Sequence, residues 1–142
     1  MEILYINSDY AIQQHEHILM ISGGLSGIRD QGLLESILEF MKNDGYIPTF
    51  EEKLNYLIFR INSYHVFTDA NKRTSIVLGA YFLELNGYDY CIKKFIRELE
   101  NIIVWVAEKK ISEELLLRIV TSIIYEDEYS EELKLEIINN IS

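Results

Sequence analysis

Two apolar helical patterns flank a short polar stretch near the middle of the chain, and this arrangement constrains the fold more than any other feature. One face of the first pattern carries Leu54, Leu57, Ile58 and Ile61. That spacing is typical of an amphipathic α-helix, here ending near Tyr64. The second pattern runs from about residue 71 to 86, and Gly79 and Ala80 in its middle indicate close packing against a neighbour. The sequence therefore predicts two helices joined by a polar connection, the second of them central.

The rest of the chain also shows helical patterns. Residues suited to helix N-caps are Ser8 or Asp9, Asp30, Thr49, Ser112 and Ser130. Glu52 lies three residues after Thr49, which is the spacing of a capping box. Residues 93–110 form a further helix, and Tyr46-Ile47-Pro48 indicates an extended segment. These patterns predict a compact all-α fold of six to eight helices, in a single domain that spans residues 1–142.

Composition argues against several classes of protein. The chain has 142 residues, a formal net charge of −10 and one cysteine, Cys91. Such an acidic surface repels a polyphosphate backbone, which argues against direct nucleic-acid binding. A single cysteine cannot form an internal disulfide, and no apolar run approaches the roughly 20 residues that span a bilayer. The N-terminus lacks the basic region and apolar run of a signal peptide. We therefore expect a cytoplasmic protein without membrane contact.

The polar stretch from His65 to Thr74 holds a proton acceptor, a carboxylate, an amide and two cations. His65 would lie at the end of a helix, where it could act as a general base or interact as a cation with the helix dipole. Asp69 precedes the next helix, so it could be the N-cap or a ligand of Mg²⁺, which often takes one or two carboxylates together with substrate phosphates. Phe67 is expected to anchor the stretch in the core.

Lys72 and Arg73 fall in the first turn of the following helix, where the helix dipole disfavours cations. Free backbone N–H groups at Ala70, Asn71 and the rest of that turn favour an anion instead. A bound phosphate would supply the counter-charge that both side chains lack locally. The conflict with helix electrostatics therefore predicts a phosphate site at this helix start.

The sequence HVFTDANKRT resembles the signature of the Fic/Doc family. The Fic pattern is H-P-F-x-D/E-G-N-G-R-x-x-R, and that of the Doc (death-on-curing) branch is H-x-F-x-D-A-N-K-R-T. Lys72 replaces the second glycine of the Fic pattern and Ile76 its second arginine, and both differences favour Doc. A second pattern, His15-Glu16 followed by residues 23–36, is similar to the N-terminal part of Doc-like proteins. The resemblance spans roughly residues 15–87.

This resemblance implies an all-α transferase that uses ATP and Mg²⁺. His65 would deprotonate a hydroxyl group on a target protein, with Lys72 and Arg73 as further catalytic residues. Asp69 would hold Mg²⁺ against the nucleotide phosphates. The residues implied to bind the nucleotide are Asp69, Ala70, Asn71, Lys72 and Arg73.

For the Doc branch, the resemblance implies transfer of the γ-phosphoryl group of ATP to a threonine or serine of a target such as elongation factor Tu. The protein would be a toxin that arrests translation and is inhibited in trans by an antitoxin. Fic-type transfer of AMP or another nucleotide is the alternative, although Ile76 lacks the charge that would orient a triphosphate tail. A catalytically silent antitoxin-binding module is a second alternative.

Four smaller expectations accompany this resemblance. His15 could hold the loop from Gly23 to Gly32, and Arg29-Asp30 could close that loop by an ion pair or border the target cleft. Tyr46-Ile47-Pro48 lies near where Fic relatives place a flap that docks the target. Ser122-Ile-Ile-Tyr-Glu126 matches only part of the family's inhibitory helix pattern, and we interpret it as a chance match.

Overall fold

The protein is built from α-helices, as the apolar periodicity predicts. The computed structural model describes residues 2–142. Within them the elements are α1 (Ser8–Ser22), α2 (Gln31–Phe40), α3 (Phe50–Ser63), α4 (Asn71–Leu85), the 3-10 turn η1 (Asp89–Cys91), α5 (Ile92–Ala107), α6 (Glu113–Tyr125) and α7 (Glu131–Ile141). The predicted all-α fold of six to eight helices is confirmed.

Polar side chains start most of these helices. Side-chain oxygens of Asp30, Thr49, Ser112 and Ser130 each accept a hydrogen bond from a backbone N–H in the first turn of the helix that follows. The prediction for α1 was one or two residues late, because its cap is Asn7 and not Ser8 or Asp9. Asn7 has an extended backbone, and its Oδ1 accepts from the N–H of Tyr10, which already places Ser8 inside the helix.

Helices α3 and α4 together form the centre of the molecule. Helix α3 packs against α2, α4, α5 and α6, whereas α4 packs against α1, α3 and α5. Buried apolar side chains form one cluster that extends from Ile6 to Ile137. The prediction that residues 71–86 form a central helix is therefore correct, and α3 shares that position.

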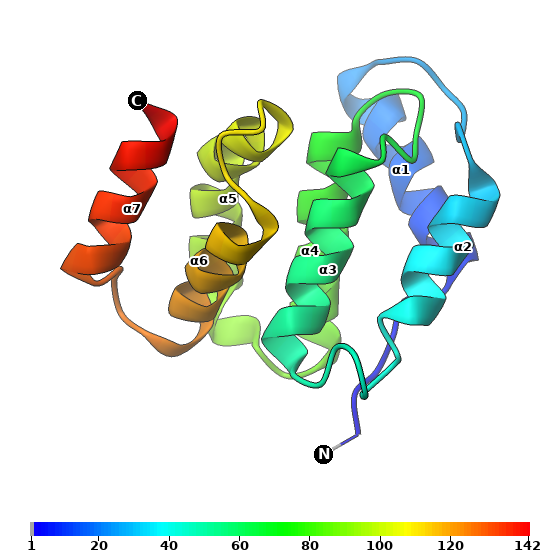
Figure 1. The fold of residues 1–142 in the computed structure, drawn as a ribbon. Coiled ribbons are helices and arrows are strands. Elements are labelled where there is room, and N and C mark those ends of the chain that lie inside the picture. The colour runs from blue at the N-terminus through cyan, green and yellow to red at the C-terminus, as the bar shows by residue number, and fades with distance from the viewer. Residues whose placement is uncertain (1) are drawn as a thin grey trace.

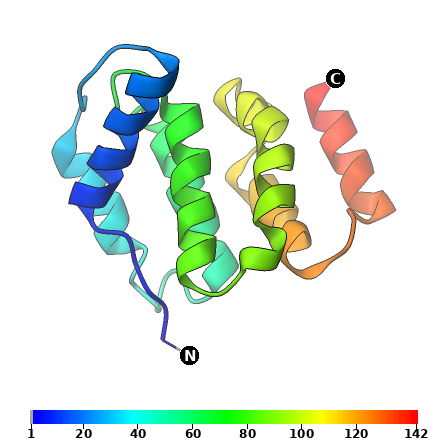
Figure 2. The same cartoon turned by 180° about the vertical axis from the view of Figure 1, so that it is seen from behind.

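The helices run up and down, so their connections gather at two ends. The α1–α2, α3–α4 and α5–α6 connections lie at one end, at the top of Figure 1, and the same grouping is seen from behind in Figure 2. The α2–α3 connection lies at the opposite end. The polar stretch therefore lies at the same end of the molecule as the two other connections.

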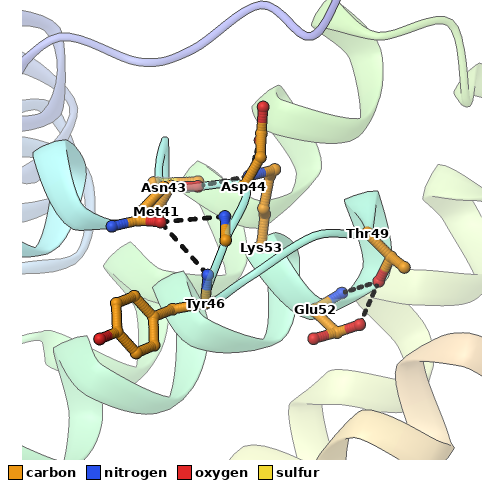
Figure 3. A network of polar contacts seen from close by, with 8 residues as sticks. Met41, Asn43, Asp44, Tyr46, Thr49, Glu52 and Lys53 are labelled. Atoms are coloured by element: carbon orange, nitrogen blue, oxygen red, sulfur yellow. Dashed lines mark hydrogen bonds and ion pairs between the residues drawn. The ribbon is translucent and has the colours of Figure 1, made fainter.

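The α2–α3 connection is a turn, which corrects the predicted extended segment at residues 46–48. Figure 3 shows Asn43 at its centre: its Oδ1 accepts from the N–H groups of Gly45 and Tyr46. The buried ammonium group of Lys53 donates to the backbone oxygen of Met41 and to Asp44, each at 2.8 Å. These side-chain contacts favour a turn over a strand. The turn lies at the end of the molecule opposite the α3–α4 connection (Figure 1).

Close approach of α4 to α5 and α3 depends on Gly79. A Cβ atom at this position would lie 2.8 Å from Cζ of Phe95 and 3.3 Å from Cδ1 of Ile58. Phe95 is fully buried, so its ring has no free space into which it could move.

We therefore expect Gly79→Val to lower the free energy of unfolding by about 1–3 kcal/mol, through overpacking. Urea denaturation would measure the loss. The matched control is Glu84→Val on the exposed face of the same helix, which should stay within about 0.5 kcal/mol of wild type. Equal effects of the two substitutions would contradict the close contact at Gly79.

Candidate functional site

The α3–α4 connection folds back on itself because of two left-handed residues. His65 follows the end of α3 with φ +48°, and its side chain is exposed. Val66 and Phe67 come next and are buried, as predicted for Phe67. The remaining residues, Thr68 and Asp69, return to the surface before α4 begins. The turn therefore places an exposed His65 and a partly buried Asp69 on either side of the buried Val66 and Phe67.

Asn71 holds this turn closed. Its Oδ1 accepts from the backbone N–H of Phe67, and its Nδ2 donates to the backbone oxygen of the same residue, both at 3.0 Å. The side-chain amide thus satisfies both the backbone N–H and the backbone oxygen of Phe67. We expected Asn71 to contribute to an anion site. In the structure its side chain stabilises the loop, and its backbone N–H remains in the first turn of α4.

Asp69 is held by two backbone N–H groups from different parts of the chain. Its Oδ2 accepts from Leu25 at 3.0 Å, and its Oδ1 accepts from Ala70 at 2.7 Å. These two bonds, that of Leu25 first, together with the charge of Arg73, hold the pKa of the Asp69 carboxyl below its usual range. The carboxylate therefore stays ionised and fixed in direction, as a metal ligand would need to be.

Helix α4 begins without a side-chain cap. Its N-cap residue is Ala70, in the left-handed conformation (φ +63°, ψ +28°), and no side chain accepts a hydrogen bond from the first turn. Asp69 is thus not the N-cap of α4, which was the structural role expected for it as the alternative to metal binding. The uncapped first-turn N–H groups are available to an anion.

Lys72 and Arg73 are both exposed on this first turn. The Arg73 guanidinium donates to Oγ of Ser22 and to the backbone oxygen of Gly23. Among the ion pairs formed by residues 2–142, none includes Lys72 or Arg73, although the protein carries an excess of acidic groups. Neither cation therefore forms an ion pair within the described residues, although Arg73 is near enough to Asp69 for its charge to lower the pKa of that carboxyl.

One cavity of about 380 Å³ brings the predicted residues together. It is lined by His65, Asp69, Ala70, Asn71, Lys72 and Arg73, and also by Asn62, Thr68 and Ala107. The last three were not predicted. Thr68 lies within the motif and could have been proposed, but Ala107 ends α5 and reaches the site only through helix packing. The cavity thus combines a histidine, a carboxylate, two cations and a helix N-terminus.

The α1–α2 connection forms one border of the site. An isolated antiparallel bridge pairs Ile28 with Phe67, and the Thr68 N–H donates to the backbone oxygen of Gly27 at 3.1 Å. The backbone N–H groups of Arg29 and Asp30 both donate to Val66. No Arg29–Asp30 ion pair forms within the described chain, because the Asp30 carboxylate caps α2. Backbone hydrogen bonds to residues 66–68 of the α3–α4 connection, and not a local ion pair, therefore hold the α1–α2 connection in place.

The site has one carboxylate to offer a metal ion. No group of three or more His, Cys, Asp or Glu side chains in residues 2–142 could hold a metal by itself. A single ionised carboxylate beside a phosphate site nevertheless suits Mg²⁺, which keeps several waters and commonly shares its coordination with substrate phosphates. Asp69 fits that donor set, whereas a self-sufficient metal centre does not fit the residues present.

Comparison with known proteins assigns the family. A sequence model of the Fic/DOC family matches residues 5–83, which include every lining residue of the cavity except Ala107. The chain therefore belongs to the Fic/Doc family. Protein kinase doc of Escherichia phage P1 is 31% identical over 87 residues, an alignment that covers 58% of this chain and 68% of the relative. This similarity supports the Doc branch.

Two further observations concern regions outside the cavity. No helix within residues 2–142 is long and apolar enough to cross a bilayer. Ser122, in the partial inhibitory pattern, is buried inside α6, and Glu126 follows the end of that helix.

The left-handed conformation at Ala70 leads to a first test of the site. An L-residue in this region costs about 1–2 kcal/mol, a penalty that glycine avoids. We expect Ala70→Gly to leave the free energy of unfolding equal to wild type or to raise it by up to about 1 kcal/mol, because glycine also gains freedom in the unfolded chain. Ala80→Gly, in the middle of α4, should lower it by about 1 kcal/mol. Thermal or urea denaturation compares the two, and equal losses would contradict the left-handed turn.

The Asp69 hydrogen bonds predict a pH dependence of stability. Because its folded pKa lies below the unfolded value of about 3.9, Asp69 stabilises the fold above that pH and loses this effect as pH falls through the folded pKa. Wild type should therefore unfold less readily than Asp69→Asn near pH 7, and the difference should shrink as the pH falls below about 4. Asp127→Asn is the control, since the Asp127 carboxylate makes no hydrogen bond within residues 2–142. A difference that stays constant with pH would exclude this role for Asp69.

Proposed function

We propose that the protein transfers the γ-phosphoryl group of ATP to a serine or threonine hydroxyl of a target protein. The observation that carries this proposal is the shared cavity, which is lined by an exposed histidine, Asp69, an uncapped helix start and two cations that form no ion pair within residues 2–142. Phosphoryl transfer depends mainly on positioning and on charge stabilisation, and these groups provide both. The similarity to protein kinase doc supports the same reaction.

Each residue has a role that follows from its position. His65 accepts the proton of the attacking hydroxyl, whose oxygen then bonds to the γ-phosphorus as the bond to the bridging oxygen breaks and ADP leaves. Lys72, Arg73 and the uncapped N–H groups of the first turn of α4, which begins at Asn71, bind the phosphate oxygens. The N–H of Ala70 donates to Asp69 instead. Asp69 would hold Mg²⁺, which when bound neutralises part of the phosphate charge.

The apolar Ile76 favours phosphoryl over nucleotidyl transfer. It lies one turn after Lys72 on α4 and is half-buried against the core, so it offers no charge to a triphosphate tail. Lys72 instead adds charge at the start of the helix. Transfer of AMP or another nucleotide is the alternative reaction at the same site.

A biological role follows from the Doc resemblance. We propose a cytoplasmic toxin that modifies a component of translation such as elongation factor Tu and is inhibited in trans by an antitoxin. An acidic surface favours protein partners over nucleic acid.

A labelling experiment separates these reactions. The protein is incubated with Mg²⁺, elongation factor Tu and ATP labelled at either the α- or the γ-phosphate. We expect label in the target from γ-labelled ATP only, and a loss of about 10²–10⁴-fold in rate for His65→Ala, because the general base is removed. His17→Ala, an exposed histidine on α1, is the control and should retain full activity.

Three other outcomes would contradict parts of this proposal. Label from α-labelled ATP only would show nucleotidyl transfer and would exclude the kinase proposal. Full activity of His65→Ala would exclude His65 as the base. Absence of transfer from either label, together with tight antitoxin binding, would favour a silent binding module.

A further inference from the structure

His15 is a buried polar side chain that the proposed chemistry does not use, yet it contacts the site directly. It comes from the middle of α1 and is fully buried. Its Nε2 lies 2.9 Å from the backbone oxygen of Asp69. Because a carbonyl oxygen only accepts hydrogen bonds, Nε2 carries the proton, and His15 donates it to the Asp69–Ala70 peptide. We expected His15 to support the loop from Gly23 to Gly32. In the structure its hydrogen bond is made to Asp69, in the α3–α4 connection.

We propose that His15 is a positioning residue, which fixes the Asp69–Ala70 peptide and thereby the direction of the Asp69 carboxylate. The role in phosphoryl transfer rests on the proposed function, whereas the positioning of the peptide does not.

Both ends of this peptide are held, and His15 supplies one of the two contacts. The carbonyl oxygen accepts from His15, and the N–H of Ala70 donates to Oδ1 of Asp69 at 2.7 Å. Ala70 adopts a left-handed conformation that costs free energy. Loss of the His15 hydrogen bond should therefore allow this peptide to rotate and relieve the strain. Rotation would withdraw the Ala70 N–H from the carboxylate and change its direction.

The ring of His15 also orients the loop by stacking. It lies parallel to the ring of the buried Phe67, with centroids 4.0 Å apart and planes 11° apart. A side chain that only filled this space would need no polar atom, and a buried polar ring is costly unless it is hydrogen-bonded. Nδ1 has no hydrogen-bond partner among residues 2–142, so the bond to Asp69 is the contact that compensates for burial.

Hydrogen exchange at the Leu25 amide is a measure of the direction of the Asp69 carboxylate. Its N–H donates to Oδ2 of Asp69, and Leu25 itself is exposed, so this bond is what protects the amide from exchange with water. Gly24 lies beside the same oxygen: a Cβ atom there would be 2.8 Å from it. Any change in the direction of the carboxylate should therefore alter exchange at Leu25.

The test compares three substitutions of His15. In His15→Gln, the amide nitrogen can take the place of Nε2 and keep the donor. His15→Met keeps an apolar filling without the donor, and His15→Phe keeps a stacking ring without it. His17→Met, on the exposed face of α1, is the matched control. NMR measures water exchange of the Leu25 and Ala70 amides without nucleotide or metal.

We expect exchange at Leu25 to rise about 3- to 10-fold in the Met and Phe variants, the factor that corresponds to loss of one hydrogen bond. The Gln and His17→Met variants should resemble wild type. In the labelling reaction, the Met and Phe variants should need several-fold more Mg²⁺ for half-maximal rate, with an unchanged KM for the target protein.

Two results would overturn the proposal. One is a lower melting temperature of the Met and Phe variants with Leu25 exchange unchanged, which would reduce His15 to a packing residue. The other is that His15→Met and His15→Phe fail to fold whereas His15→Gln folds, because the hydrogen bond of His15 would then be needed for the stability of the whole protein. Neither depends on activity: a wild type that transfers no label would refute the proposed function and leave the exchange result intact.

Discussion

The contact between α3 and α4 is the constraint on which the rest of the structure depends. Gly79 lets α4 approach its neighbours closely, and the apolar face of α3 fills the space between α2, α4, α5 and α6. With both helices fixed, the short connection between them has to reverse the chain within a few residues. It does so through left-handed backbone at His65 and Ala70, with Phe67 buried between them. The positions of the catalytic candidates are thus a consequence of helix packing.

The site also shows how an acidic protein can place cations close together. The chain carries a formal charge of −10, but the cavity gathers Lys72, Arg73 and an uncapped helix start. The carboxylate beside them is tied to the N–H groups of Leu25 and Ala70 and forms no ion pair with Arg73 within the described residues. Local geometry therefore gathers positive charge at one place on a chain whose net charge is negative.

Most of the fold could be predicted from the sequence because its signals are local. Apolar spacing gave the helices, and Asp30, Thr49, Ser112 and Ser130 gave their starts, since a cap depends on residues only three positions apart. The failures were also local in cause. Asn43 turns a segment that appeared extended, and Asn7 precedes the expected cap of α1. In both cases a competing asparagine side chain was not recognised.

The sequence by itself determined the ionisable groups of the site, because His65, Asp69, Lys72 and Arg73 lie within ten positions and two cations conflict with an ordinary helix start. Only the tertiary structure decided what holds them. His15 and Leu25 reach Asp69 across separations of 54 and 44 residues, and Ala107 closes the cavity from the end of α5. Such contacts leave no periodic or local signal, since they arise from the packing of α1 and α5 against the central pair. The structure also shows that Asn71 clamps the loop through Phe67, only four residues away, and that Asp69 is not the cap of α4.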